Sequence, residues 1–460
     1  SQTEYRAYDA MHNLCKISRQ DVGTTVYTKN YLGEVLSMAQ GVSGGSNNDC
    51  DRNADLSKTM VLKYDNMGSV WLVDYPDSTP DLEYVADNLG NVTDLFSGST
   101  QQSYKYNDLR LIESESLILG ARSWDIDYKF DGLGSLEYLT YPDDDQLSFT
   151  PNGFGQPTEV KRVARPGRAA FTYVEGVDYY PSGQADTFSY GNGLIHKTTL
   201  NSRNLPKEIK DYSDSFTVLN YSYSYDNVYN IKTITDKVDS KFSLTDLQYD
   251  GLNRLISTAG NSGIGSSTIR YDGLGNITYY ASQNRVLDYT YVNHKLDSVS
   301  GSGSEGKNYS FKYDGRGNVS GDGTRSFTFN LANQLSSSGG NSYVYDGFSR
   351  RIKAVDSNDT SEYSFYSHGG QLLYREVEGN GVNYIYLGDR LVAKDGITPQ
   401  NSGKQHYRPY GSSIEGEQDD AGYTGHKFDT DLGLSYMQAR YYDPVIGRFL
   451  SNDPVGFLGH

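Results

Sequence analysis

The sequence predicts an all-β protein made of antiparallel hairpins, and three observations lead to this prediction. Of the 460 residues, 42 are Tyr and 49 are Gly; tyrosine suits a pleated sheet with one wet face, and glycine marks turns. Apolar residues make up only 36% of the chain, against about 45–50% in globular proteins. Either the sheet is therefore wet on one face or the body is hollow. The third observation is a recurring Tyr-Asp-Gly motif.

The Tyr-Asp-Gly motif defines a repeat. Clear copies stand at Tyr249-Asp250-Gly251, Tyr271-Asp272-Gly273, Tyr313-Asp314-Gly315 and Tyr345-Asp346-Gly347. When looser copies are included, the aromatic residues that begin the copies are 16 to 24 residues apart: Tyr225, Tyr249, Tyr271, Tyr291, Tyr313, Phe329 and Tyr345. A step of about 20 residues fits two strands and two turns. Weaker copies near Tyr8, Tyr64 and Phe130 extend the pattern toward the N-terminus.

The chemistry of one copy predicts a hairpin turn. Tyrosine ends a strand, and the aspartate accepts hydrogen bonds from backbone N–H groups further along the turn. The following glycine is expected to supply a positive φ, and a second Gly or Asn to complete the reversal. An apolar residue such as Leu255, Ile277 or Val319 opens the returning strand. Such a hairpin cannot bury its own face, so neighbouring copies must form one long sheet.

Charge and cysteine content limit the classes of function. The net charge of −17 argues against a nucleic-acid groove or an anionic membrane surface, which need basic patches. No stretch approaches the roughly 20 apolar residues of a membrane span. No signal-like segment opens the chain at Ser1, so we expect a processed product or a fragment. Cys15 and Cys50 are compatible with one disulfide or with two free buried thiols.

Some motifs resemble binding sites but lack the context that those sites need. Asp49, Asp51, Asn53 and Asp55 alternate like the oxygen ligands of a calcium loop, but the required Gly and the final Glu are missing. They form a weak calcium candidate, and a polar surface loop is the favoured interpretation. No other metal site and no cofactor is expected, since the seven histidines form no cluster with cysteines.

Two glycine motifs lack the context that an active or cofactor site needs, and the first is interpreted as a flexible loop. Gly41-Val42-Ser43-Gly44-Gly45 matches a nucleophile elbow, but a polar stretch follows it where a helix is required. Gly301-x-Gly303-x-x-Gly306 matches a dinucleotide fingerprint, but it leads into the predicted strand at residues 309–311.

The C-terminal segment carries the most specific pattern. It contains a Thr-Gly-His-Lys-Phe-Asp stretch ending at Asp429, Ala439-Arg440-Tyr441-Tyr442-Asp443-Pro444, Gly447-Arg448-Phe449 and Asp453-Pro454-Val455-Gly456, preceded by Tyr407-Arg408-Pro409-Tyr410-Gly411. Together these resemble the Rhs-associated core. With the repeats, the chain resembles the Rhs/YD-repeat family, which includes Rhs polymorphic toxins, Tc toxin C subunits and the teneurin shell.

The resemblance implies a spiralling antiparallel β-ribbon that forms a hollow shell or part of one. It implies three regions: a degenerate YD-repeat region at 1–220, a regular YD-repeat shell at 221–400, and the Rhs-associated core as a C-terminal plug at 401–460. It also implies a C-terminal toxin cargo as partner, together with the remainder of the shell or a partner shell subunit. We expect a secreted or cell-surface bacterial protein.

The resemblance further implies an aspartyl autoprotease acting on the chain's own C-terminal region. Two neighbouring carboxylates cannot both ionise, so one keeps a proton while the other activates water. The best matches are Asp429 and Asp453, with Asp431 and Asp443 as alternates. Phe428 stands where cleaving members often carry Arg, a His-x-Asp-x-x-Gly element before Tyr407 is missing, and the chain stops at His460 before the usual cleavage motif. The competing interpretation is that these aspartates only cap turns.

Three functions compete. The leading one is a shell that encapsulates and helps to deliver a toxin domain. The alternative is a cell-surface adhesion or carbohydrate-binding protein built on the same shell. A β-propeller is disfavoured, because its blades need about 40–45 residues each with a Trp-Asp signature, and the chain has only two Trp.

Overall fold

The computed structural model describes residues 3–42, 46, 49–50, 55–397 and 404–452. Within this part the regular structure is strand and short 3-10 turn: Leu56–Lys58, Ser240–Phe242 and Tyr423–Gly425 are the 3-10 turns. The predicted all-β, antiparallel fold is confirmed. No helix long and apolar enough to cross a membrane occurs among the described residues.

The largest sheet has 27 strands, each antiparallel to the next in the chain. Its strands are β1 (Glu4–Tyr8), β2 (Leu14–Arg19), β3 (Gly23–Lys29), β4 (Val35–Val42), β5 (Thr59–Tyr64), β6 (Val70–Asp74), β7 (Leu82–Ala86), β8 (Val92–Ser97), β9 (Thr100–Tyr106), β10 (Ile112–Leu119), β11 (Arg122–Phe130), β12 (Leu136–Thr140), β13 (Gln146–Pro151), β14 (Pro157–Arg162), β15 (Phe171–Tyr179), β16 (Ala185–Tyr190), β17 (Ile195–Leu200), β18 (Pro206–Tyr212), β19 (Thr217–Tyr225), β20 (Ile231–Asp236), β21 (Leu244–Tyr249), β22 (Leu255–Gly260), β23 (Ser267–Tyr271), β24 (Ile277–Ser282), β25 (Arg285–Val292), β26 (Lys295–Ser302) and β27 (Tyr309–Ser310). We call this sheet the outer ribbon.

Three smaller sheets follow. A two-stranded sheet joins β28 (Lys312–Tyr313) to β29 (Val319–Gly321). The inner sheet has eight strands: β30 (Phe327–Phe329), β31 (Leu335–Ser338), β32 (Asn341–Tyr345), β33 (Arg351–Val355), β34 (Ser361–Tyr366), β35 (Leu372–Val377), β36 (Asn380–Leu387) and β37 (Arg390–Gly396). The plug sheet has four: β38 (Lys427–Asp429), β39 (Leu434–Met437), β40 (Arg440–Asp443) and β41 (Arg448–Phe449).

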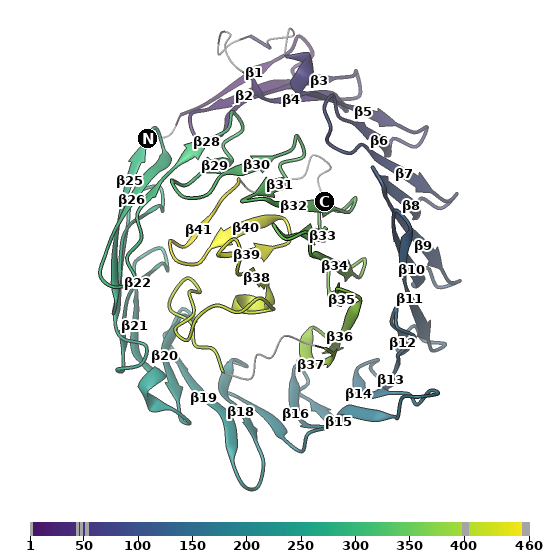
Figure 1. Cartoon of the computed structure of the whole chain (residues 1–460), viewed down its shortest axis with the longest axis vertical. Helices are drawn as coiled ribbons and strands as arrows, with labels where there is room; N and C mark the ends of the chain where they lie inside the picture. The colour runs from purple at the N-terminus through teal and green to yellow at the C-terminus, as the bar shows by residue number, and fades with distance from the viewer. Residues whose placement is uncertain (1–2, 43–45, 47–48, 51–54, 398–403, 453–460) are drawn as a thin grey trace.

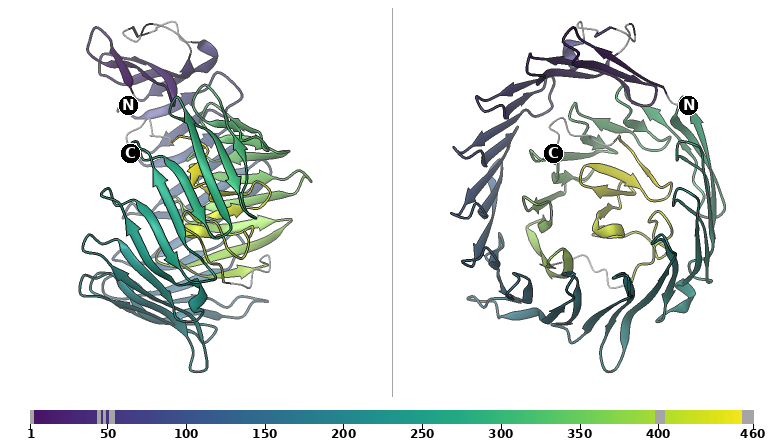
Figure 2. Two further views of the ribbon diagram at one scale, coloured as in Figure 1. Left: turned by 90° about the vertical axis from the view of Figure 1, so that its left-hand side faces the viewer. Right: turned by 180° about the vertical axis from the view of Figure 1, so that it is seen from behind.

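The outer ribbon curves into a ring that surrounds the other sheets (Figure 1). The inner sheet follows the inside of the ring beside β5–β16, and the plug sheet lies in the middle, an arrangement that Figure 2 shows again from behind. The ladder of the outer ribbon runs through residue 220 within β19 without a break. The division at residues 220 and 400 stays a prediction.

Each repeat turn is built as predicted around its aspartate. Asp272 accepts hydrogen bonds from the backbone N–H groups of Leu274 and Asn276, both at 2.9 Å. One detail of the prediction is wrong, because the positive φ belongs to the fifth residue of the copy: Gly275 has a φ of 89° and Asn253 of 59°. The glycine directly after the aspartate, such as Gly273, keeps an ordinary backbone conformation.

The tyrosine of each copy links neighbouring repeats. Its hydroxyl donates to the carbonyl of the apolar residue that opens the returning strand of the repeat before. This bond joins Tyr249 to Ile231 (2.9 Å), Tyr271 to Leu255 (2.7 Å), Tyr291 to Ile277 (2.9 Å) and Tyr313 to Leu296 (2.7 Å). The tyrosines that begin these copies therefore have a structural role, because their hydroxyl groups stabilise the contact between neighbouring repeats of the sheet.

Two apolar cores join the layers. One packs β10–β16 of the outer ribbon on β33–β37, and contains Ile126, Val174, Ile352 and Ile385. The other joins β23–β27 to the plug sheet, and contains Leu287, Val299, Leu434 and Ile446. The plug is therefore part of the hydrophobic core of the molecule.

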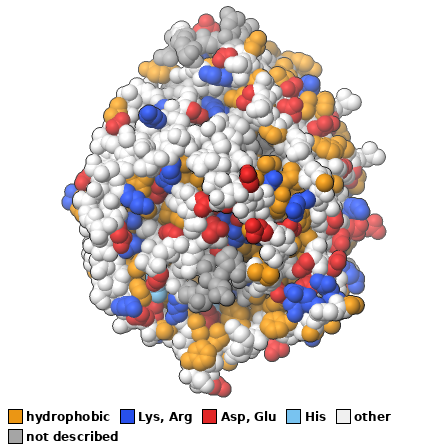
Figure 3. Space-filling model, in the orientation of Figure 1, with side chains coloured by type: hydrophobic (Ala, Val, Ile, Leu, Met, Phe, Trp, Pro, Cys, Tyr) orange, Lys and Arg blue, Asp and Glu red, His pale blue; other side chains and the backbone are white. Residues whose placement is uncertain are grey.

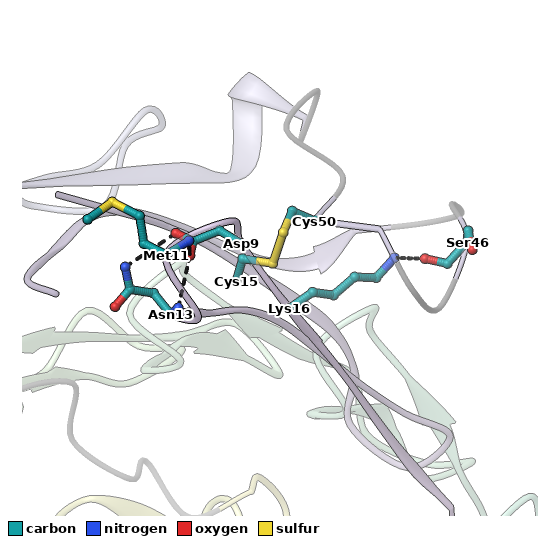
Figure 4. The surroundings of a disulfide bond; sticks show 7 residues. All are labelled: Asp9, Met11, Asn13, Cys15, Lys16, Ser46 and Cys50. Atoms are coloured by element: carbon teal, nitrogen blue, oxygen red, sulfur yellow. Dashed lines mark hydrogen bonds between the residues drawn. A yellow bond between two sulfur atoms is a disulfide. The ribbon is translucent and has the colours of Figure 1, made fainter. Parts of the chain in front are cut away.

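A disulfide links Cys15 of β2 to Cys50, so of the two alternatives for these cysteines the structure shows the bonded one. Lys16, next to Cys15, is buried and donates to the carbonyl of Ser46 at 3.1 Å (Figure 4). The disulfide therefore holds the connection after β4 against the start of the ribbon.

Candidate functional site

The candidate catalytic residue Asp429 lies at the end of β38 and faces the inner sheet. Arg351 of β33 binds both of its carboxylate oxygens, at 2.5 and 2.8 Å, and Lys427 donates to it at 2.7 Å. Asp429 and Arg351 are 7% and 3% exposed. Burial raises the pKa of Asp429, but the two cations outweigh burial and hold that pKa well below its ordinary value. Asp429 is therefore an ionised carboxylate.

Asp429 belongs to a charged network between the plug and the inner sheet. Arg375 of β35 contacts Glu362 at 2.6 Å and Asp419 at 3.1 Å, while Lys427 contacts Asp419 at 3.0 Å. Among the described residues this charged network joins four cations to four carboxylates: Arg351, Arg375, Lys394 and Lys427 with Glu362, Asp419, Asp420 and Asp429. Its charges therefore balance.

Asp443, at the end of β40, is a buried turn residue that shares Arg325 with Asp322. Its Oδ1 accepts from the N–H of Val445 at 2.9 Å, and its carbonyl accepts from the N–H of Gly447. Arg325 approaches its Oδ2 at 3.1 Å and also donates to the carbonyl of Leu432. Burial raises the pKa of Asp443 above its ordinary value. For Asp443 the turn-capping interpretation holds.

Asp429 and Asp443 do not form a proton-sharing pair. Asp429 pairs with Leu434 on one side of β39, and Tyr442 pairs with Ser435 on the other side. Asp443 therefore lies two strand spacings from Asp429, roughly 10 Å. Asp431 lies exposed in the turn after β38, and Asp453 lies outside the described residues. The catalytic assignment of Asp429 and Asp453 stays a prediction.

The other candidate motifs carry no assembled site in the described chain. Asp55 caps a 3-10 turn by accepting from the N–H of Ser57 at 3.0 Å, and Asp49 is described, while Asp51, Asn53 and Ser43 lie outside the described residues. Within that part of the chain, no group of three or more His, Cys, Asp or Glu side chains is placed to hold a metal ion. Gly301 lies in β26, and the chain continues from Gly303 to β27, so a strand and not a helix follows this glycine motif, as predicted.

The sequence interpretation missed the arginines that bind the plug. The repeats did carry a signal for one of them: where other copies open the returning strand with Leu255, Ile277 or Val319, the copy at Tyr345 has Arg351. A charged side chain at a buried apolar position needs a buried partner. Asp429 is that partner.

Comparison with known proteins supports this architecture. No profile of a known protein family matches the chain. A tRNA3(Ser)-specific nuclease, WapA, of Bacillus spizizenii is 28% identical over 260 residues, which is 54% of this chain and 10% of WapA. Toxin subunit YenC1 of Yersinia entomophaga is 34% identical over 95 residues, 18% of this chain and 9% of the subunit.

The solved structure of TcdB2–TccC3 without its hypervariable C-terminal region has the same fold. Its TM-score is 0.72 at 15% identity, over 99% of this chain and 29% of that chain. The chain thus spans about a tenth of WapA and less than a third of TcdB2–TccC3. The resemblance to the Rhs/YD-repeat proteins and to the Tc toxin shell is confirmed.

Proposed function

We propose that this Rhs-like chain forms part of a shell that encloses a C-terminal toxin cargo and helps to deliver it. The observation that carries the proposal is the position of the plug: residues 404–452 lie inside the ring of the outer ribbon (Figures 1 and 2). A polypeptide that continues from the plug therefore begins inside the ring of the outer ribbon. The outer ribbon and the plug share one apolar core, which includes Leu287 and Leu434. This shared core fixes the plug in its position.

The chain spans only part of the length of the similar proteins, and this indicates which further partners the shell needs. Because it covers 29% of the TcdB2–TccC3 chain, the rest of the shell comes from further YD-repeat ribbon or a partner subunit. A secreted or cell-surface location fits the similarity to bacterial toxins. The disulfide between Cys15 and Cys50 supports it, since such bonds persist in oxidising compartments.

Cleavage of the chain's own C-terminal region is part of this proposal. Arg351 and Lys427 keep Asp429 ionised, so Asp429 is the member of the pair that orients water. Asp453 is then the member that keeps a proton. The cut releases the cargo inside the shell.

Protection from a protease tests the proposed enclosure. In a protein that continues past His460, a recognition site for a specific protease is inserted directly after His460. A matched variant carries the site after Leu133, which is 88% exposed in an outer turn. We expect the outer site to be cut at least about tenfold faster, because the inner one is reached only when the shell opens. Equal rates in the native protein would contradict enclosure and favour an adhesin with an exposed downstream region.

A further inference from the structure

A pocket of about 400 Å³ lies beside Asp429, between the inner sheet and the plug. Cavities of this size hold small ligands or single side chains. Val355, Val377 and Val382 form an apolar part of its wall, and Lys427 and Asp429 of the charged network also line it. We call it the lumen pocket. In Figure 3 acidic side chains lie near the middle of this face of the molecule, with basic side chains among them.

The lumen pocket has an excess of negative charge. The charged network is balanced as a whole, so the excess comes from carboxylates outside it. Asp356, Glu378 and Asp431 also line the pocket, and no salt bridge is found for these three within the described part of the chain. Backbone N–H groups of Thr360 and Asn358 hold the pKa of Asp356 below its ordinary value, so Asp356 is ionised.

Buried polar atoms of the lumen pocket also lack partners. Tyr343 is 8% exposed, and its hydroxyl makes no hydrogen bond of normal geometry with any described residue. The same holds for Oε1 of Glu362, whose Oε2 contacts Arg375 at 2.6 Å. A buried carboxylate oxygen without a donor costs free energy until a ligand or water supplies one. Both atoms can accept a hydrogen bond from a cation.

We propose that the lumen pocket binds a lysine or arginine side chain of the polypeptide enclosed by the shell. The aliphatic stem of such a side chain packs on Val355, Val377 and Val382, as long basic side chains do on apolar surfaces. Its charged end donates to Oε1 of Glu362 and to the hydroxyl of Tyr343, the two acceptors that lack a donor. This inference rests on the proposed function, because the enclosed polypeptide is the occupant.

Peptide binding to the folded chain tests the proposal. The probe is a fluorescent arginine–glycine peptide, and its comparison is the same peptide with citrulline, which has the shape of arginine without the charge. The pocket variant is Asp356→Asn, Glu378→Gln and Asp431→Asn. Asparagine preserves the turn, since Asn152 forms the same hydrogen bonds in a sibling turn. The control variant removes three charges from the outer ribbon through Asp65→Asn, Glu83→Gln and Asp108→Asn.

We expect the arginine peptide to bind at least tenfold more tightly than the citrulline peptide, about 1.4 kcal/mol. The pocket variant should lose this preference, and the control variant should keep it. Equal losses in both variants would overturn the proposal, because they would show general attraction to an acidic protein. Equal binding of the two peptides to the wild type would also overturn it. Binding of the free peptide does not depend on whether the downstream region is enclosed. A negative result here can therefore be distinguished from a negative result in the protease test.

Discussion

Arg351 of the inner sheet binds both carboxylate oxygens of Asp429 in the plug, at 2.5 and 2.8 Å. The two residues come from different sheets and are both buried. Nη1 of the same arginine also donates to the hydroxyl of Tyr441 at 2.9 Å, and its backbone N–H donates to the hydroxyl of Tyr436. One residue of the inner sheet thus contacts three strands of the plug.

Removing one member of this pair should destabilise the protein strongly. We expect Arg351→Met or Asp429→Asn to lower the free energy of unfolding by about 3–5 kcal/mol, because a buried charge is left without its partner. Urea denaturation measures the change. Arg6→Met is the control, since Arg6 pairs with Glu4 at the exposed surface and should leave the urea midpoint unchanged. Equal effects of Arg351→Met and Arg6→Met would contradict the role of Arg351.

The proposed cleavage predicts that substitutions of Asp429 and Asp453 affect self-cleavage differently from a substitution of Asp443. In a chain extended past His460 into its natural downstream region, Asp429→Asn and Asp453→Asn should each abolish a discrete cut. Asp443→Asn should preserve it, because Asp443 lies roughly two strand spacings away. Electrophoresis and mass determination of the fragments provide the measurement. Identical cutting in the wild type and in both Asp429→Asn and Asp453→Asn would exclude these residues as catalytic.

Gly347 tests the contact between the inner sheet and the outer ribbon. A Cβ built on Gly347 would lie 2.3 Å from Cγ of Leu95, which is fully buried. We expect Gly347→Ala to cost about 1–3 kcal/mol through overpacking. Gly273 occupies the same place in its own repeat and has no atom within 4 Å, so Gly273→Ala should be neutral or slightly stabilising. Matching melting temperatures for the two variants would show that the layers do not pack this way.

Glu115 should make stability fall as pH rises. It is buried under the turn of His368, whose backbone N–H it accepts at 2.7 Å, and it also binds the hydroxyl of Tyr128. Burial raises its pKa from 4.5 to about 7, against the nearby charge of Arg350. Between pH 4.5 and about 7 the folded state therefore holds a proton on Glu115 that the unfolded state has lost. The stabilisation from this proton is complete below pH 4.5 and is lost as pH rises past about 7.

Glu115→Gln isolates this effect. The variant should gain stability relative to the wild type as pH rises, by about 3 kcal/mol at full deprotonation. Thermal melts of both proteins across this pH range measure the difference. A constant difference between the two proteins would show that Glu115 does not titrate there.

The disulfide should stabilise the start of the outer ribbon. Cys15 and Cys50 are separated by 35 residues, and closing a loop of this length restricts the unfolded chain by about 3–4 kcal/mol. Cys15→Ser with Cys50→Ser should lower the melting temperature and reduce hydrogen-exchange protection in β2–β5. Protection in β33–β37 should stay unchanged. A uniform loss of protection would indicate that the disulfide supports the whole shell.

The repeat made most of the fold predictable from the sequence. The turn aspartates and the alternation of strands follow from local chemistry, because the same residue types recur in each copy of the motif. The contacts between Arg351 and Asp429, or between Gly347 and Leu95, join residues far apart in the chain. Nothing in one copy of the motif identifies its partner in another layer. Arg351 replaces an apolar residue of the repeat, which marks it as unusual but does not say which carboxylate it binds.

An electron cryo-microscopy map of a protein that continues past His460 tests the central claim most directly. Enclosure predicts density for the downstream region inside the ring, continuous with the plug at Asn452, whose side chain donates to the carbonyl of Arg316 at 3.0 Å. Density for that region outside the outer ribbon, with the plug still in place, would contradict the account.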